Sequence, residues 1–517
     1  MRERCGPDAV NGSRAENRPT GSRDPAWVSV LGAAPEGNGH GDCPTGTVST
    51  IDSTISKRHA SPIRRRPPIP RVLALLLGVV LSAAAVTVPR AETSDGSGTL
   101  LIEDIVIEGA VKTTRETVLH NLVVRPGDAI APDALFHLAD PLVDRGIFVR
   151  ASVHTRPGSA PGRIVAVIDA EERGPQLRFG LGYEDLTGWY LIPAELDFDN
   201  ASGHGETLRA GVRFGYRVGG VVLEAGRAAG PRGGLFWRAR ATAETVDRVY
   251  FYQDTEIAHP VRRGGLELRL GSELRGGTSL FGWVAEQSAE ADSSARIYQK
   301  NEEEGRKAGT EVPFEDLPPG VARDLERQHL TRFGVGARLD RRQGPELLQH
   351  GVAGTVELEG IAFPDGAFGR GLLDLRGYLP LGRGAAIAAR TQLAGVGPRA
   401  PFYERLYLGG LYSVRGFPSQ SLSRPQGETH LASGSIELRA PWVGPAARPT
   451  LAGLVFVDTG VSWSDDLAAQ RLSVGAGYGV RIRLPWVRYL GVDVGFPLTA
   501  SPAQEAFHVN ASLGWTY

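Results

Sequence analysis

The chain has 517 residues, too many for one ordinary small domain, so its length indicates two or three folded units or one large barrel. Its charge is balanced, with 57 Lys and Arg against 58 Asp and Glu, which gives no electrostatic reason to expect a nucleic-acid partner. A mean hydropathy of −0.16 excludes a helical membrane protein of many spans, but it leaves room for a transmembrane β-barrel, whose strands alternate apolar and polar side chains.

Residues 1–63 form a polar extension rich in Gly, Ser and Asp, and they precede a segment typical of a signal peptide. In this segment, residues 64–91, a basic stretch from Arg64 to Arg71 precedes the apolar run VLALLLGVV, and small residues at 83–85 offer a cleavage site. A single-span anchor is the alternative, although the apolar run is short for a span. Because a signal peptide normally opens a chain, the extension is expected to be disordered or to reflect a start codon assigned too early.

After a linker at 92–99, residues 100–173 predict one small α+β domain with the element order β-α-α-β-β. Its expected elements are a strand at 101–108, a helix capped by Thr113 or Thr114, a helix that begins at Pro132 and ends before Gly146, and strands at 148–155 and 164–170. The residues of this unit include no catalytic constellation, so we interpret it as a binding or scaffold module.

Residues 174–517 repeatedly alternate apolar and polar side chains, and no helix is expected among them. For example, Leu266, Leu268 and Leu270 alternate with Glu267, Arg269 and Gly271. A period of two places the two sets on opposite faces of a sheet. Sixteen strands are predicted, at 176–185, 189–198, 205–216, 219–228, 233–245, 262–273, 278–287, 329–340, 351–361, 368–381, 384–394, 431–440, 451–460, 472–484, 487–496 and 507–517.

Alternation does not tell which face meets water, because the apolar set is the core of a soluble sandwich but contacts lipid in a membrane barrel. Two features favour the barrel. The signal peptide indicates export, and the two longest connections, 288–328 and 395–430, both follow odd-numbered strands and therefore emerge at one rim. The sequence thus predicts a mainly β protein, an antiparallel transmembrane barrel of sixteen strands, in which the charged connection 288–328 is a solvated extracellular loop.

The last predicted strand, FHVNASLGWTY at 507–517, is the sharpest local signal of a barrel. Its apolar face carries Phe507, Val509, Ala511, Leu513, Trp515 and Tyr517. At the edge of a soluble sheet these side chains would be an aggregation hazard. We therefore expect a lipid-facing strand whose terminal aromatic side chain lies in an interfacial girdle.

Three stretches resemble motifs of the BamA/TamA outer-membrane assembly family, also called the bacterial surface antigen family. The first stretch resembles the VRGF motif of the family's sixth loop and consists of Val414, Arg415, Gly416 and Phe417. The second resembles the FxDxG motif of its thirteenth strand and consists of Phe456, Asp458 and Gly460. The third, Asp340-Arg341-Arg342, lacks the usual second acid. Residues 100–173 also resemble the family's POTRA domain.

The resemblance implies that the loop carrying Arg415 folds back into the barrel and that Arg415 pairs with Asp458 on the inner wall. Strand parity agrees, because Asp458 lies on the face opposite Val455 and Val457. As an alternative, Arg415 is a solvated loop residue and Asp458 pairs with another arginine of the lumen.

The resemblance also implies a location in the outer membrane of a Gram-negative bacterium, with the POTRA domain in the periplasm. Its function would be to assemble or translocate outer-membrane β-proteins without enzymatic chemistry. A weak seam between the first strand, which has two glycines, and the last would open an edge for a client strand. The expected partners are the lipid bilayer, unfolded outer-membrane proteins or a secreted client, and a periplasmic or inner-membrane accessory protein.

Other functions stay open: a two-partner secretion pore for one dedicated substrate, a passive porin or surface-antigen barrel, and a soluble enzyme. Only one POTRA unit is evident, whereas BamA-like proteins carry several and secretion pores usually carry two with a plug helix. The sequence offers no Ser/His/Asp set or phosphate loop, and Cys5 and Cys43 have no partner at zinc or redox spacing. We therefore expect no enzyme activity, no cofactor and no metal.

Overall fold

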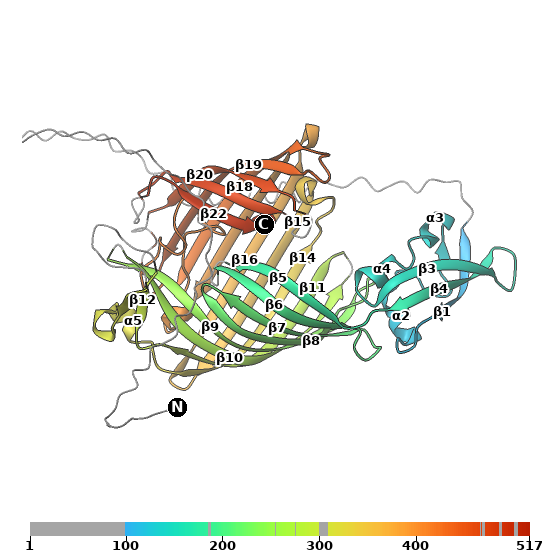
Figure 1. The fold of residues 1–517 in the computed structure, drawn as a ribbon, viewed down its shortest axis with the longest axis horizontal. Coiled ribbons are helices and arrows are strands. Elements are labelled where there is room, and N and C mark those ends of the chain that lie inside the picture. Colours follow the sequence, from blue (N-terminus) through green and yellow to red (C-terminus); the bar gives the residue numbers. More distant parts are fainter. Residues whose placement is uncertain are drawn as a thin grey trace, which may run out of the picture. The chain divides into compact units, whose positions relative to one another are not determined.

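The computed structural model describes residues 99–517, apart from 185–187, 254, 275, 299–308, 466, 468–470, 485–488 and 501–504. The expected polar extension, the signal peptide, nearly all of the linker and both cysteines lie outside the described residues. What is described consists of a small α+β domain and a β-barrel (Figure 1). Within the described part of the chain, no helix is both long enough and apolar enough to cross a bilayer.

The small α+β domain is a four-stranded sheet whose core packs against short helices. Its elements are β1 (Leu100–Glu108), α2 (Arg115–Asn121), β2 (Ala129–Ile130), α3 (Pro132–Leu135), α4 (Asp140–Asp144), β3 (Phe148–Pro157) and β4 (Arg163–Glu172). The strand order is β2-β1-β4-β3, and β1 runs parallel to β4. Ile102 and Ile105 of β1, Val118 of α2 and Leu142 of α4 are fully buried in one core.

The predicted order β-α-α-β-β is found with two differences. Thr114 caps α2, its hydroxyl accepting a hydrogen bond from the Thr117 amide at 3.2 Å. The helix expected from Pro132 is instead two short helices, because Pro141 has no amide hydrogen to donate to the preceding turn and lies in the first turn of α4. Strand β2 has two residues, too few for any alternation to be detected in the sequence.

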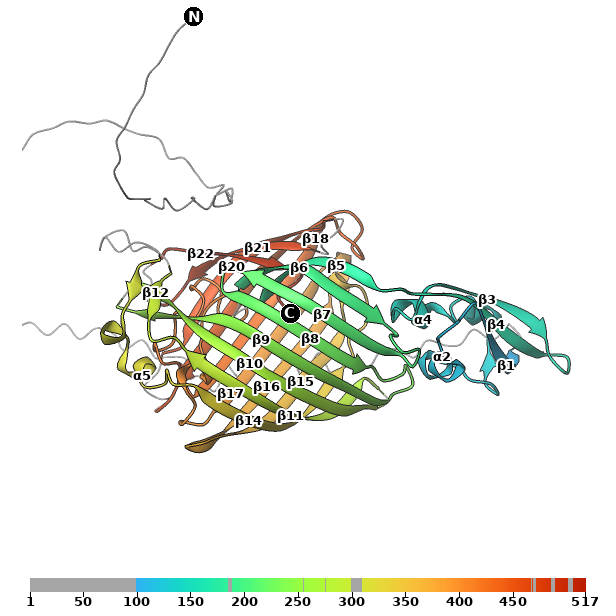
Figure 2. The same cartoon turned by 60° about the horizontal axis from the view of Figure 1, so that its bottom comes forward.

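The rest of the described chain is a closed antiparallel barrel, seen from two directions in Figures 1 and 2. Its wall strands are β5 (Gln176–Glu184), β6 (Gly188–Asp199), β7 (Glu206–Gly215), β8 (Val218–Arg227), β9 (Gly234–Tyr252), β10 (Thr255–Leu274), β11 (Thr278–Ala291), β14 (Gln328–Asp340), β15 (Gly351–Phe363), β16 (Gly366–Pro380), β17 (Ala386–Val396), β18 (His430–Val443), β19 (Leu451–Trp463), β20 (Ser473–Ile482), β21 (Leu490–Pro497) and β22 (His508–Leu513). The described sheet has eighteen strands, and two of them, β12 and β13, belong to a loop. Subtracting these two from eighteen leaves the sixteen wall strands that the sequence predicts.

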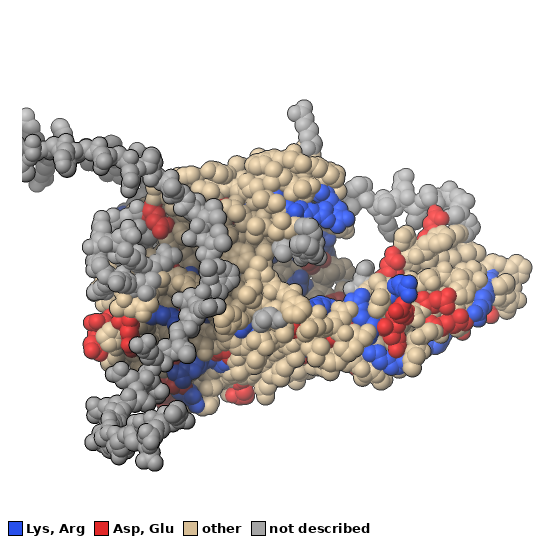
Figure 3. Space-filling model, in the orientation of Figure 1, with Lys and Arg blue, Asp and Glu red and all other residues tan. Residues whose placement is uncertain are grey.

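The outer face of the barrel is apolar, as the alternation predicts. Leu208, Leu266 and Phe333 are 44%, 67% and 59% exposed on that face. Glu267 and Arg269, which alternate with the leucines of β10, line a cavity of the interior instead. The part of the barrel wall visible in Figure 3 is mostly free of charged side chains. This is the pattern of a wall that contacts lipid.

The described part of the long connection after β11 is packed rather than simply solvated, which corrects the expectation for that part; the acidic run 302–304 lies outside the described residues. Its described elements are β12 (Ala295–Ile297), β13 (Glu311–Val312), η2 (Phe314–Asp316) and α5 (Pro319–Ala322). Ile297, Leu317 and Val321 are buried in one apolar cluster with Tyr250 of β9 and Phe402 of the next long connection. The four-residue helix α5 also corrects the expectation of no helix in this region. Widely spaced apolar residues among many charges gave no periodic signal. Two further short helices, η3 (Glu346–Leu348) and η4 (Gly382–Gly384), lie in connections at the opposite rim.

Candidate functional site

The connection between β17 and β18, residues 397–429, folds into the barrel and is termed the lumen loop. Val414 and Phe417 of its VRGF motif are both 0% exposed. They pack with Leu408 of the same loop and with Leu431 of β18 in one apolar cluster. The motif is therefore held inside the barrel, where the family resemblance places it, and is not on a solvated surface.

Glycines of the inner wall make room for this loop. A Cβ on Gly475 would lie 1.9 Å from the carbonyl oxygen of Arg415, and a Cβ on Gly495 would lie 2.4 Å from the amide nitrogen of Gly416. Gly460 of the FxDxG motif faces the loop in the same way. Gly416 has a φ of +99°, which L side chains rarely adopt. Glycine is needed on both sides of this contact.

Arg415 is 1% exposed, and all three nitrogens of its guanidinium group donate hydrogen bonds to carboxylates of the inner wall. Its Nε and Nη2 donate to the two carboxylate oxygens of Asp458 at 2.7 and 2.9 Å, a bidentate pair. Its Nη1 donates to Glu437 at 2.6 Å and to Asp493 at 3.2 Å. The guanidinium carbon lies 3.6 Å from the ring centre of Phe456, so the predicted FxDxG motif supplies both an ion pair and an aromatic face.

Two further arginines balance these carboxylates. Arg439 lies 2.7 Å from Glu437, and Arg481 lies 2.5 Å from Asp493. Together with Arg415 and Asp458 these residues form the buried charge cluster, of three arginines and three carboxylates, each at most 1% exposed. A balanced set of this kind tolerates burial, but loss of any one member leaves an unpaired charge away from water.

The structure thus brings together the sequence-predicted residues Arg415, Phe456 and Asp458. Two further partners of Arg415, Glu437 and Asp493, were not predicted, because neither belongs to the VRGF or FxDxG motif. The alternation of its strand does place Glu437 on the inner face. A search for inward-facing acids on the strands after the VRGF motif would have identified both.

The end of the chain corrects one expectation, because β22 stops at Leu513 and does not continue to residue 517. Phe507 and Val509 face outward as predicted and are 53% and 46% exposed. Gly514 then adopts a φ of +78°, which breaks the alternation of a strand.

Trp515 and Tyr517 consequently turn into the lumen and do not lie in a lipid-facing girdle. The Tyr517 hydroxyl donates to Ser435 Oγ at 3.0 Å, and Arg439 donates to the Tyr517 carbonyl at 3.0 Å. The Arg439 guanidinium carbon also lies 4.7 Å from the centre of a Trp515 ring. The polar groups of the inner wall offer these residues partners that lipid cannot offer.

The barrel closes where β22 lies beside β5. Among adjacent wall strands, these two make the least contact. No ion pair or side-chain hydrogen bond joins them among the described residues, whereas Arg178 of β5 lies 2.8 Å from Asp197 of β6. The seam is therefore the weakest join in the wall.

A second polar anchor holds the lumen loop near its start, at η5 (Phe402–Glu404). The carboxylate of Glu404 is 2.6 Å from Arg332 of β14 and 2.6 Å from Arg370 of β16. Burial opposes ionisation of Glu404, but the charges of Arg370, Arg332 and Arg263 outweigh it and lower its pKa to about 2. The polarity is the reverse of that at Arg415, because here the loop supplies the acid and the wall supplies the arginines.

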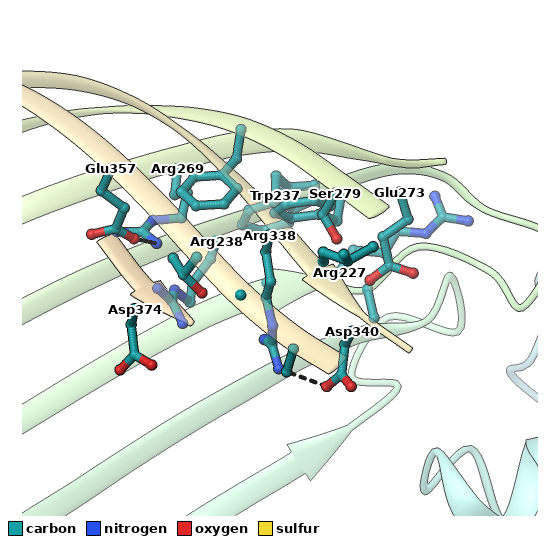
Figure 4. Close-up of a pocket in the computed structure, with 18 of the residues that line it drawn as sticks. Arg227, Trp237, Arg238, Arg269, Glu273, Ser279, Arg338, Asp340, Glu357 and Asp374 are labelled. Atoms are coloured by element: carbon teal, nitrogen blue, oxygen red, sulfur yellow. Dashed lines mark ion pairs between the residues drawn. The ribbon is translucent and has the colours of Figure 1, made fainter. Parts of the chain in front are cut away.

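Charged side chains line two adjoining cavities of the lumen. One, of about 530 Å³, is drawn in Figure 4, where Arg338 pairs with Asp340 at 3.5 Å and Arg269 faces Glu357. A second cavity, of about 430 Å³, shares Arg269 and Glu357 with the first. Within the described residues, no group of three or more His, Cys, Asp or Glu is placed to hold a metal ion. The cavities offer polar binding surface.

The profile described as the Omp85 superfamily domain matches residues 232–517, more than half of the chain. BamA from Haemophilus ducreyi lacking POTRA domains 1–3 is similar with a TM-score of 0.58 at 16% identity, over 80% of this chain and 84% of that one. CdiB from Acinetobacter baumannii is similar with a TM-score of 0.50 at 15% identity, over 81% of this chain and 74% of that one. No curated protein sequence matches the chain significantly.

Proposed function

This chain belongs to the Omp85 superfamily of outer-membrane barrels, and on that premise we propose that it helps to insert β-rich proteins into the outer membrane through the seam between β5 and β22. The family comprises transporters and assembly factors and not enzymes. Membrane lipid and client proteins are the partners that this membership implies.

The observation that carries the proposal is the weakness of the seam. Where β5 and β22 separate, each exposes a row of unpaired backbone amides and carbonyls toward lipid. Such an edge binds another strand by backbone hydrogen bonds with little regard for its sequence. Gly180 and Gly182 in β5 support this role, because glycine in a strand packs little side chain against its neighbour and weakens the pairing.

The lumen loop argues against a passive porin. Its VRGF motif is buried and its Arg415 is fixed to three wall carboxylates, so this level of the barrel is filled with protein. A diffusion pore needs an open aqueous path, whereas an insertase that works at its wall does not.

The small α+β domain fits the role of a POTRA domain in the periplasm that receives clients or an accessory protein. Strand β3 lies at the edge of its sheet, in the order β2-β1-β4-β3, and most of its residues are exposed. An exposed edge strand can accept a client segment by strand addition.

A secretion pore for one dedicated substrate is the second candidate, and the charged cavities of the lumen favour it because they offer polar space for a chain in transit. In that case the lumen loop must leave its anchors during transport.

Depletion of the protein in its own host separates the two functions. We expect the abundance of several folded outer-membrane barrels to fall together, measured by quantitative proteomics of the outer-membrane fraction and by heat-modifiable migration on gels. Loss of a single secreted protein with normal barrels would instead favour the dedicated pore. Normal levels of both would contradict either function.

A further inference from the structure

The anchor of Glu404 consists of an arginine cradle, defined as Arg263 of β10, Arg332 of β14 and Arg370 of β16. Arg332 and Arg370 each lie 2.6 Å from one carboxylate oxygen of Glu404, and Arg370 also donates to its backbone carbonyl at 2.6 Å. Arg263 donates to the carbonyl of Tyr403 at 3.0 Å. Two strands of the wall thus hold the Glu404 carboxylate, and a third holds the backbone carbonyl next to it.

The wall supplies this cradle with one direct ion-pair partner among the described residues. Apart from the Glu404 carboxylate, the only described carboxylate that pairs with Arg332 and Arg370 is that of Glu359, at 3.3 and 3.9 Å. Arg263 forms no ion pair within the described residues. When the loop carboxylate leaves, Glu359 is the one described wall acid that stays ion-paired with the cradle. Glu267 and Glu357 line the same cavity but pair with Arg269 instead. Guanidinium groups that have lost a direct partner and are partly desolvated attract another carboxylate.

The cradle can be reached from the lumen. The cavity of about 430 Å³ is lined by all three arginines and by Glu404. Its lining also includes Trp283 and Gln287 of β11, which can contact neighbouring side chains of an extended segment. The cavity of about 530 Å³ adjoins it through shared residues, so the polar space is larger than one small anion requires.

We propose that the arginine cradle is a binding site for the carboxylate of an acidic peptide segment in the lumen, and that Glu404 occupies this site as an internal ligand while the lumen loop is in place. Guanidinium groups donate strong, charge-assisted hydrogen bonds to carboxylates, and Arg332 and Arg370 each donate one to a different oxygen of Glu404. A client that presents an Asp or Glu side chain competes with Glu404 and thereby favours release of the loop. That the natural ligand is a client rests on the proposed function, whereas the site itself does not.

The test measures equilibrium binding of fluorescent peptides to the full chain purified in detergent, with no membrane and no client. Glu404→Ala should bind a short oligo-glutamate peptide about tenfold or more tightly than the wild type does, since the cradle is then vacant. An oligo-glutamine peptide of the same length should gain nothing. Adding Arg332→Gln and Arg370→Gln to Glu404→Ala should abolish the gain.

Glu428→Ala is the matched control. Glu428 is a buried acid of the same loop, but its arginine partner, Arg424 at 2.8 Å, belongs to the loop and not to the wall. This variant loosens the loop without vacating the cradle, so oligo-glutamate should bind to it as weakly as to the wild type.

If Glu404→Ala does not fold, Glu404→Gln replaces it in the test, because glutamine keeps the side-chain volume and removes the charge. Glu404→Gln should also bind oligo-glutamate more tightly than the wild type, but by a smaller factor than is expected for Glu404→Ala. Equal binding of the two peptides, or equal gains in the Glu404 and Glu428 variants, would overturn the proposal. Neither result would bear on depletion, so failure of this site is distinguishable from failure of the proposed function.

Discussion

Arg415→Ala is expected to destabilise the folded barrel by about 3–5 kcal/mol, because it leaves the carboxylates of Asp458, Glu437 and Asp493 short of one cation in a site closed to water. The measurement is urea unfolding in lipid vesicles, followed by tryptophan fluorescence. Arg415→Lys should fall between the wild type and Arg415→Ala, because an ammonium group keeps the charge but not the bidentate fork.

Arg399→Ala serves as the control, because Arg399 is an exposed arginine of the same loop. It should change the free energy of unfolding by less than about 1 kcal/mol. The pairing itself is tested by a double-mutant cycle with Asp458→Ala. We expect the two losses to overlap by about 0.5–3 kcal/mol, and simple additivity would contradict the contact.

Gly475→Val should expel the lumen loop from the barrel, because its Cβ would lie 1.9 Å from a backbone atom of Arg415 and neither backbone can easily move. The released loop would take Arg415 out of the buried charge cluster, so the stability loss should match or exceed that of Arg415→Ala. Exposure is measured with a Val414→Cys reporter, since Val414 is fully buried when the loop is in place. Its thiol should react at least roughly tenfold faster after expulsion.

Ala476→Val is the matched control on the same strand. Position 476 is paired with Phe496 and faces away from the loop, so the added methyl groups meet the lipid side of the barrel. Reactivity of the Val414→Cys thiol should stay at its wild-type level. Equal reactivity in the Gly475 and Ala476 variants would show that the loop does not depend on the glycine.

The wall strands could be predicted from the sequence because their period-two pattern is set locally by burial of one face. The prediction at 329–340 differs by one residue from β14 (Gln328–Asp340). The strand predicted at 233–245 ended too early, because β9 continues to Tyr252. The far end of β9 packs against other residues on both faces and so loses its alternation. The family motifs then located Arg415 and Asp458.

Contacts across the lumen could not be predicted in this way. Glu404 lies 72 residues from Arg332 and 34 from Arg370, and no local pattern encodes which inward charge meets which loop. The turn at Gly514 was also hidden, since the residues after it keep the apolar alternation of a strand although Tyr517 is held by Ser435 inside the barrel. Both depend on tertiary partners that compete with local preference.

The participation of the seam is tested most directly by photocrosslinking in living cells. A photoreactive amino acid replaces either Phe179 of β5, 73% exposed, or Val509 of β22, 46% exposed. The control position is Phe333 of β14, which is 59% exposed on a wall strand several neighbours away from the seam. We expect newly made outer-membrane proteins to crosslink at Phe179 and Val509 and not at Phe333. Equal yields at all three positions, or none at the seam while barrels are being inserted, would contradict the proposal that clients join the membrane through it.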